Sequence, residues 1–159
     1  MKFQQQLEQC LTSGGVFLTS GGEGERNVMT MGWGMTGVMW GKPVFLAPVR
    51  TTRHTFDLIQ KTGCYAVCIP KSDRKKELAV CGSKSGRDAD KFALTGLKAL
   101  PCRQIDAPAV ADCLVIECKV AYQTTLEKSA LPADIRERWY QKNDLHTLMI
   151  GEIVDEYEL

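Results

Sequence analysis

Hydrophobic and polar residues alternate in short runs along most of the chain, which is the pattern of half-buried β-strands. These runs predict strands at 14–22, 27–36, 42–50, 64–70, 99–105, 113–126 and 146–159. In the run at 113–126 the alternation places Leu114, Ile116, Cys118 and Val120 on one face. Helical spacing replaces the alternation in five short segments, at 1–12, from Thr52 to Gly63, at 74–82, at 88–95 and at 132–140.

Several predicted strands follow one another directly, without a helix between them, which argues against a doubly wound parallel sheet. The pattern therefore predicts a mainly β fold, an antiparallel barrel with short peripheral helices. The chain has 159 residues, of which 44% are hydrophobic and 25% charged. This length and composition are typical of one globular domain, which we expect to span 1–159.

Composition also limits the classes of partner and cofactor. The opening residues carry glutamines where a signal peptide has an apolar segment, and no apolar run approaches the roughly 20 residues that span a bilayer. We therefore expect a cytoplasmic protein without a membrane partner. The net charge of +1 gives no extended field for nucleic acid. Seven cysteines without a C-x-x-C pair, and only two histidines, predict no metal site and thiols that pack as small hydrophobes.

The predicted strand at 27–36 has two unlike faces. One face is bulky and carries Asn27, Met29, Met31, Trp33 and Met35. The other is small and carries Val28, Thr30, Gly32, Gly34 and Thr36. Glycines on the small face would leave backbone amides and carbonyls bare for a flat, polar-edged ligand. The alternative is a barrel corner at which the glycines relieve crowding.

Two basic segments lie where a predicted strand or loop enters a helix. Residues 49–55, VRTTRHT, place two arginines among three threonines, and a helix start adds unpaired amides and a partial positive charge. Such a combination favours phosphate binding. Residues 82–92, GSKSGRDADKF, offer further donors, although Ser85 and Asp88 also fit a helix cap. For 49–55 the alternative is two solvated arginines beside an ordinary helix cap.

The familiar nucleotide and nucleophile motifs are missing. The chain has no G-x-G-x-x-G after a strand, no G-x-x-x-x-G-K-[ST] and no G-x-S-x-G. We therefore expect no catalytic side chain of the nucleophilic type.

Several segments in order resemble one known family. They are NVMTMGWG (27–34), WGKPVF (40–45), VRTTRHT (49–55), SKSGRDADKF (83–92) and DLHTLMIGEIV (144–154). Together they resemble the flavin reductase-like, FMN-binding split-barrel family, and within it the flavoredoxin branch. The resemblance runs from about residue 14 to 154. It implies a Greek-key split barrel, a homodimer and one FMN per subunit near the dimer interface.

The resemblance also implies roles for individual residues. The isoalloxazine ring and ribityl chain would lie along Asn27, Met29, Thr30, Met31, Gly32 and Trp33. The phosphate would be held by Arg50, Thr51, Thr52, Arg53 and Thr55. A further loop would close on the cofactor with Ser85, Gly86, Arg87 and Lys91, and His146 would approach the flavin from the last strand. Thr51 and His54 depart from the family pattern, and the cysteines match no functional position.

Three functions remain open at this stage. The first is an oxidoreductase that passes electrons from NADH or NADPH through FMN to a flavin, an iron complex or a redox partner. The second is an FMN-binding electron carrier without nicotinamide activity of its own. The third is a small barrel unrelated to flavin that grips single-stranded nucleic acid or a protein.

Overall fold

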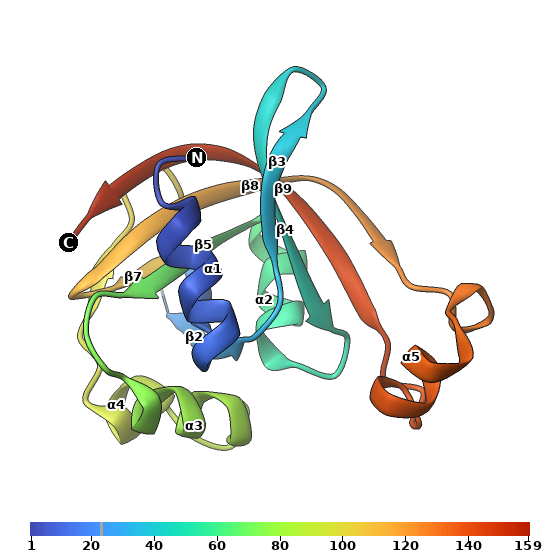
Figure 1. Cartoon of the computed structure of the whole chain (residues 1–159). Coiled ribbons are helices and arrows are strands. Elements are labelled where there is room, and N and C mark those ends of the chain that lie inside the picture. The colour runs from blue at the N-terminus through green and yellow to red at the C-terminus, as the bar shows by residue number, and fades with distance from the viewer. Residues whose placement is uncertain (23) are drawn as a thin grey trace.

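The computed structural model describes residues 1–22 and 24–159 of the chain (Figure 1). The helices are α1 (Gln4–Ser13), α2 (His54–Thr62), α3 (Lys75–Ser83), α4 (Lys91–Thr95), the 3-10 helix η1 (Lys128–Ala130) and α5 (Ala133–Trp139). The strands are β1 (Val16–Gly22), β2 (Glu25–Met31), β3 (Met35–Met39), β4 (Lys42–Arg50), β5 (Cys64–Pro70), β6 (Ala99–Pro101), β7 (Pro108–Val110), β8 (Cys113–Thr125) and β9 (His146–Glu158).

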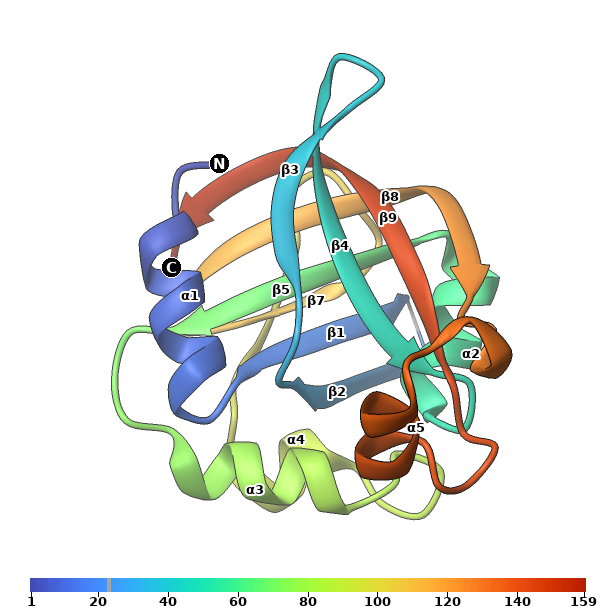
Figure 2. The same ribbon diagram turned by 45° about the vertical axis from the view of Figure 1, so that its right-hand side comes forward.

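Seven strands form one antiparallel sheet in the order β2-β1-β5-β8-β9-β4-β3. The sheet curls into a barrel, as Figure 2 shows, and its two edge strands β2 and β3 are joined by residues 32–34. Bulges in the β8–β9 ladder, between Glu117 and Cys118 and between Val120 and Tyr122, accompany this curvature. The fold is the mainly β, antiparallel Greek-key split barrel with short peripheral helices that the sequence predicts.

Strand β8 is buried on both faces over its first half. Leu114, Ile116 and Cys118 pack inside the barrel, on the single face that the alternation predicts. Cys113 and Val115 pack on the opposite face in a second cluster, which also contains Ala109 and Val110 of β7. This outer layer explains why polar residues are absent from the start of the strand.

A buried carboxylate ties the segment after β6 to the sheet. Glu117 is fully buried on β8 and accepts hydrogen bonds from the backbone amides of Arg103 (2.6 Å) and Gln104 (2.7 Å). It also accepts one from the Tyr157 hydroxyl (2.6 Å) on β9. The Arg103 guanidinium lies 3.7 Å from the centre of the Tyr157 ring. Three donors on one buried carboxylate make this a strongly coupled contact between three segments.

The predicted strand at 27–36 is wrong as a single element. Strand β2 ends at Met31, residues 32–34 belong to no strand, and β3 begins at Met35. A Cβ at Gly34 would lie 3.0 Å from the Phe45 ring, so this glycine allows a close approach to the barrel core. The alternation continues in the sequence through a segment in which the backbone changes direction.

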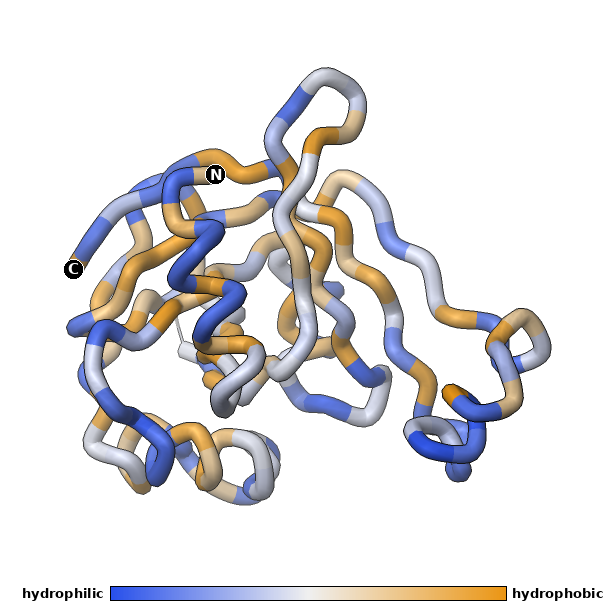
Figure 3. Tube along the Cα trace, viewed as in Figure 1, coloured by the Kyte–Doolittle hydropathy of each residue, from blue (hydrophilic) through white to orange (hydrophobic). Residues whose placement is uncertain are grey.

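The hairpin of β3 and β4 projects from the barrel (Figure 1), and its β3 arm is hydrophobic just below the tip (Figure 3). Met35, Val38 and Trp40 are each at least 60% exposed. Large apolar side chains as exposed as these are candidates for contact with another protein surface.

Helix boundaries differ from the predicted ones by a few residues. Helix α2 begins at His54 rather than after Thr52, whose hydroxyl bonds the Asp144 carboxylate instead (2.9 Å). Helix α4 begins at Lys91, where Asp90, and not Ser85, supplies the side-chain cap. The predicted strand at 99–105 is cut to β6, which pairs with β7, a strand that the pattern does not predict.

Five of the seven cysteines are buried and Cys10 and Cys102 are half-buried, all as free thiols. Burial raises the pKa of the Cys81 thiol to about 11 and that of Cys113 to about 12, so both stay protonated. No group of three or more potential metal ligands occurs in the described residues. Within 1–22 and 24–159, no helix has the length and apolar character needed to cross a membrane.

Candidate functional site

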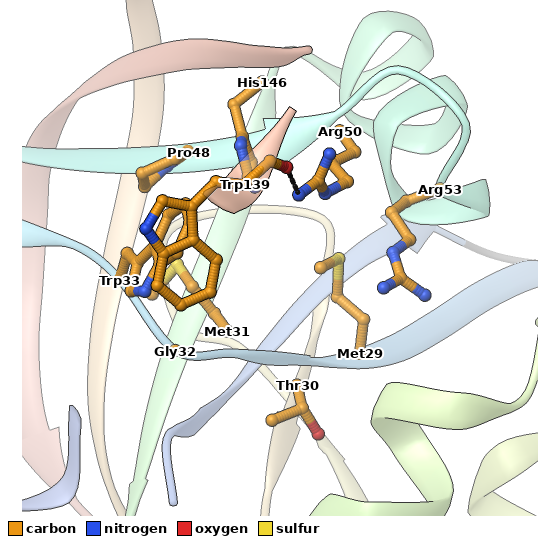
Figure 4. A pocket seen from close by; sticks show the side chains of 10 residues that line it. All are labelled: Met29, Thr30, Met31, Gly32, Trp33, Pro48, Arg50, Arg53, Trp139 and His146. Atoms are coloured by element: carbon orange, nitrogen blue, oxygen red, sulfur yellow. Dashed lines mark hydrogen bonds between the residues drawn. The ribbon is translucent and has the colours of Figure 1, made fainter. Parts of the chain in front are cut away.

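An aromatic cavity of about 190 Å³ opens beside the end of β2 (Figure 4). We call it the aromatic cavity, and its lining residues are Met29, Thr30, Met31, Gly32, Trp33, Pro48, Arg50, Arg53, Trp139 and His146. The Trp33 and Trp139 rings meet edge to face with centroids 4.9 Å apart. The centroid of the His146 ring lies 5.0 Å from that of Trp33. Aromatic walls combined with several polar side chains suit a planar ligand that has polar edges.

The sheet register brings these residues together from distant parts of the chain. Arg50, at the end of β4, is paired with His146, at the start of β9. Helix α5, in the segment between β8 and β9, folds back so that Trp139 stands over the cavity (Figure 4). The mouth of the barrel is thus built from the ends of three strands and one short helix.

A second cavity of about 130 Å³ lies at the start of α2. We call it the basic cavity, and it is lined by Asn27, Met29, Thr52, Arg53, His54, Thr55, Ser83, Lys84, Ser85, Gly86 and Lys91. Helix α2 begins without a side-chain cap, so its first amides remain available to a ligand. Met29 and Arg53 line both cavities, which shows that the two adjoin.

The basic cavity holds buried polar groups that an anion would satisfy. Lys91 is only 4% exposed, and its ammonium donates to the Cys81 carbonyl (3.1 Å). Burial, together with the nearby Arg53 guanidinium, lowers the pKa of Lys91 to about 8. His54 Nδ1 is buried without a hydrogen-bond partner in the described chain. A phosphate between these groups would offset the cost of their burial.

The same lysine predicts a pH dependence of stability. Its pKa is about 8 when folded and 10.5 normally, so between these values the unfolded chain binds more protons and the folded state gains stability as pH rises. We expect flavin-free Lys91→Met to be more stable than wild type at about pH 7. This difference should shrink by about 3 kcal/mol as the pH rises past 10.5. Urea unfolding of both proteins across this pH range measures the difference in the free energy of unfolding. A difference that does not change with pH would show that burial of the Lys91 ammonium does not destabilise the folded protein.

Arg50 is bound to the segment that carries Trp139. Its guanidinium donates to the Trp139 carbonyl (3.1 Å) and to the Asp144 carbonyl, and forms an ion pair with the Asp144 carboxylate (3.6 Å). It also stacks over the Tyr140 ring at 5.2 Å. Arg50 therefore lines the aromatic cavity and holds its cover in place, and it does not line the basic cavity.

Comparison with known proteins gives the family. Residues 9–158 match the model of the flavin reductase like domain. The chain belongs to the flavin reductase-like family. Among solved structures, the flavoredoxin of Methanosarcina acetivorans is 26% identical with a TM-score of 0.69, covering 91% of this chain and 67% of that one. The flavoredoxin of Desulfovibrio vulgaris (Miyazaki F) is 26% identical with a TM-score of 0.71, covering 92% and 70%.

A more distant structure shares the fold alone. The NADH:FAD oxidoreductase of Streptomyces globisporus C-1027 is 18% identical with a TM-score of 0.66, covering 92% of this chain and 76% of that one. Membership of the flavin reductase-like family, together with the two flavoredoxins, supports a flavin-dependent redox function.

The structure gathers most of the residues that the resemblance singles out. The aromatic cavity contains Met29, Thr30, Met31, Gly32, Trp33, Arg50, Arg53 and His146, and the basic cavity contains Asn27, Met29, Thr52, Arg53, Thr55, Ser85, Gly86 and Lys91. Gly86 packs so closely on Asn27 that an added Cβ would lie 2.3 Å from the amide oxygen. Most of the residues that the resemblance singles out therefore line one of two adjoining cavities.

Two of the expected residues lie outside both cavities. Thr51 is exposed and lines neither one. Arg87 pairs with the Asp57 carboxylate (2.5 Å) and donates to the Thr52 carbonyl (2.9 Å). The positive charge of Arg87 is therefore neutralised by Asp57 of helix α2.

The open glycine–threonine face is a wrong expectation. Thr30 points away from the other side chains in Figure 4 and donates to the Leu78 carbonyl of α3 (2.5 Å). Val28 is buried in the outer cluster on the same face. Helices α3 and α4 cover this face, so the cavity lies on the Met29 and Met31 side. Of the two glycines on this face, Gly32 keeps open space beside its backbone, with no atom within 4 Å of an added Cβ.

Trp139 and Pro48 are the site residues that sequence reasoning missed. Trp139 follows a run of charged residues in 132–140, which indicates only a peripheral helix. Its place over the cavity depends on the return of the chain through Asp144 to β9, which local patterns do not encode.

Proposed function

We propose that this chain binds FMN, with the isoalloxazine ring in the aromatic cavity and the phosphate in the basic cavity. The proposal treats 1–159 as a single FMN-binding domain. The observation that carries it is the junction of the two cavities at Met29 and Arg53, with the buried Lys91 in the basic one alone. A planar ring joined through a short chain to a phosphate matches this arrangement.

The residues present fit such a ligand. Trp33 and Trp139 offer aromatic walls, and the backbone beside Gly32 is open to the polar edge of a ring. Arg53, Lys91 and the uncapped start of α2 provide donors and positive charge for a phosphate. Arg50 fixes the cover of the aromatic cavity, which limits the access of water to the ring.

We further propose an oxidoreductase that takes electrons from NADH or NADPH and delivers them to a flavin, an iron complex or a redox partner. Bound FMN supplies the hydride and single-electron chemistry. Backbone donors near Gly32 would stabilise negative charge on the polar edge of the ring. No side chain needs to act as nucleophile.

Rapid mixing of FMN-loaded protein with each nicotinamide tests this activity. We expect the visible flavin absorption to bleach in a single saturable phase with NADH or NADPH. FMN that binds but is never reduced by either donor would contradict the proposed donor and leave FMN binding intact.

The electron carrier is the second candidate, because the two flavoredoxins are the neighbours at 26% identity. It predicts FMN that accepts electrons from dithionite or a ferredoxin-like donor and not from nicotinamides.

We propose a homodimer through the projecting hairpin. Its exposed residues Met35, Val38 and Trp40 continue from Trp33, which lines the aromatic cavity. A second copy on this patch would shield both the patch and the mouth of the cavity. Seven free thiols and a nicotinamide donor are consistent with a cytoplasmic location.

A further inference from the structure

His146 and Tyr140 form a buried pair at the wall of the aromatic cavity. The Tyr140 hydroxyl lies 2.7 Å from His146 Nδ1, and the two rings are nearly perpendicular at 85°. Tyr140 is 4% exposed and His146 is 9% exposed. Tyr140 directly follows α5, so this contact also joins the cover of the cavity to strand β9.

Two proton arrangements fit the distance between these atoms. Either Tyr140 donates to Nδ1, which places the imidazole proton on Nε2, or a protonated Nδ1 donates to Tyr140. The second arrangement leaves the Tyr140 hydroxyl proton needing another acceptor, and residues 1–22 and 24–159 offer it none. An unpaired buried hydroxyl costs about 1–3 kcal/mol. The first arrangement satisfies both groups.

The charges around the pair keep the imidazole neutral. Burial lowers the pKa of His146 to about 4, the guanidiniums of Arg50 and Arg53 act in the same direction, and Asp144 opposes them. Burial also raises the pKa of the Tyr140 hydroxyl. At neutral pH the imidazole therefore carries one proton, and the phenol keeps its own.

The second ring nitrogen faces the cavity. His146 Nε2 has no hydrogen-bond partner in the described parts of the chain and is not one of their buried unpaired atoms. It is therefore accessible, and His146 lines the aromatic cavity. Contact with Trp33 at 5.0 Å between centroids restricts rotation of the ring.

We infer that Tyr140 is a positioning residue that holds His146 in the tautomer with its proton on Nε2. The aromatic cavity then presents a neutral hydrogen-bond donor, suited to an uncharged acceptor such as a ring nitrogen or carbonyl of a heteroaromatic ligand. This inference rests on the proposed function for the identity of that ligand and on the protein alone for the tautomer.

Nitrogen-15 NMR of the flavin-free protein tests the tautomer directly. The chain has only two histidines, so a His54→Gln variant assigns the His146 signals. We expect a pyridine-type shift at Nδ1 and a pyrrole-type shift at Nε2, unchanged around neutral pH. A pyrrole-type Nδ1, or two pyrrole-type nitrogens from a charged ring, would overturn the inference.

A matched pair of variants tests the role of Tyr140. Tyr140→Phe keeps the ring under Arg50 but removes the donor, and we expect its His146 shifts to move toward the average of two tautomers. Tyr122→Phe alters an exposed tyrosine and should leave them unchanged. Unchanged His146 shifts in folded Tyr140→Phe would overturn the positioning role. If Tyr140→Phe does not fold, the wild-type shifts still decide the tautomer.

Titration with FMN then tests the donor. We expect the proton on Nε2 to shift as FMN fills the cavity in the wild type. FMN binding without such a shift would contradict contact with the ligand. Failure of nicotinamide reduction would contradict the proposed activity but not the tautomer, so the two failures are distinguishable.

Discussion

Replacing Lys91 with methionine is expected to weaken FMN binding about tenfold to a hundredfold and to leave riboflavin binding nearly unchanged. Lys91 lines the basic cavity but not the aromatic cavity, and riboflavin has no phosphate that could bind there. Methionine keeps the length of the side chain and removes only the ammonium. Arg53→Ala should weaken both ligands, FMN more strongly, because Arg53 lines both cavities. Flavin fluorescence titration measures all four affinities.

Two other arginines provide the controls for this experiment. Arg74 pairs with Glu77 and Asp112 at the start of α3, so Arg74→Ala should leave both affinities as in wild type. Arg87→Ala should have a much smaller effect than Arg53→Ala, because Arg87 is paired with Asp57. Equal losses of FMN and riboflavin in Lys91→Met would remove the phosphate from the basic cavity.

Replacing Glu117 with alanine is expected to lower the free energy of unfolding by about 3–5 kcal/mol. The change leaves two backbone amides and the Tyr157 hydroxyl without their buried acceptor. It also opens a cavity beneath the segment that begins at Arg103. Urea unfolding of the flavin-free proteins measures the loss.

Tyr157→Phe is the matched variant for this prediction. It removes one of the three donors and leaves the carboxylate bound to both amides, so it should cost about 1–2 kcal/mol. Similar losses in Glu117→Ala and Tyr157→Phe would show that the two amides contribute little. FMN affinity should be unchanged in Tyr157→Phe, because Tyr157 lines neither cavity.

The strands could be predicted where the alternation of residue types follows the backbone. It does so in β8 and β9, both of which lie within a residue or two of their predicted bounds. It fails at 32–34, where alternation continues although the chain leaves the sheet. A glycine permits such a turn without requiring it, so the pattern alone cannot reveal the break.

Most of the basic cavity could be predicted because its residues, apart from Asn27 and Met29, lie in two short segments, at 49–55 and 82–92. The sequence could not show which of its cations are already paired with a carboxylate. Arg50 is bound by Asp144 and Arg87 by Asp57, and these pairs join residues 94 and 30 positions apart. Local sequence offers no measure of such distant pairing, whereas the structure separates Arg53 and Lys91 from the paired arginines.

The cavities and the identity of the ligand are inferred from different observations. The geometry provides a flat aromatic cavity joined to a basic one, and family membership supports a flavin. Neither the composition nor the spacing of residues names FMN. The central claim is therefore the orientation of one ligand across two cavities.

A crystal structure of the protein grown with FMN tests that claim most directly. The account predicts the phosphate within hydrogen-bond distance of Lys91 and Arg53, and the isoalloxazine ring against Trp33 and Trp139. A phosphate beside Arg50, or a ring outside the aromatic cavity, would contradict it.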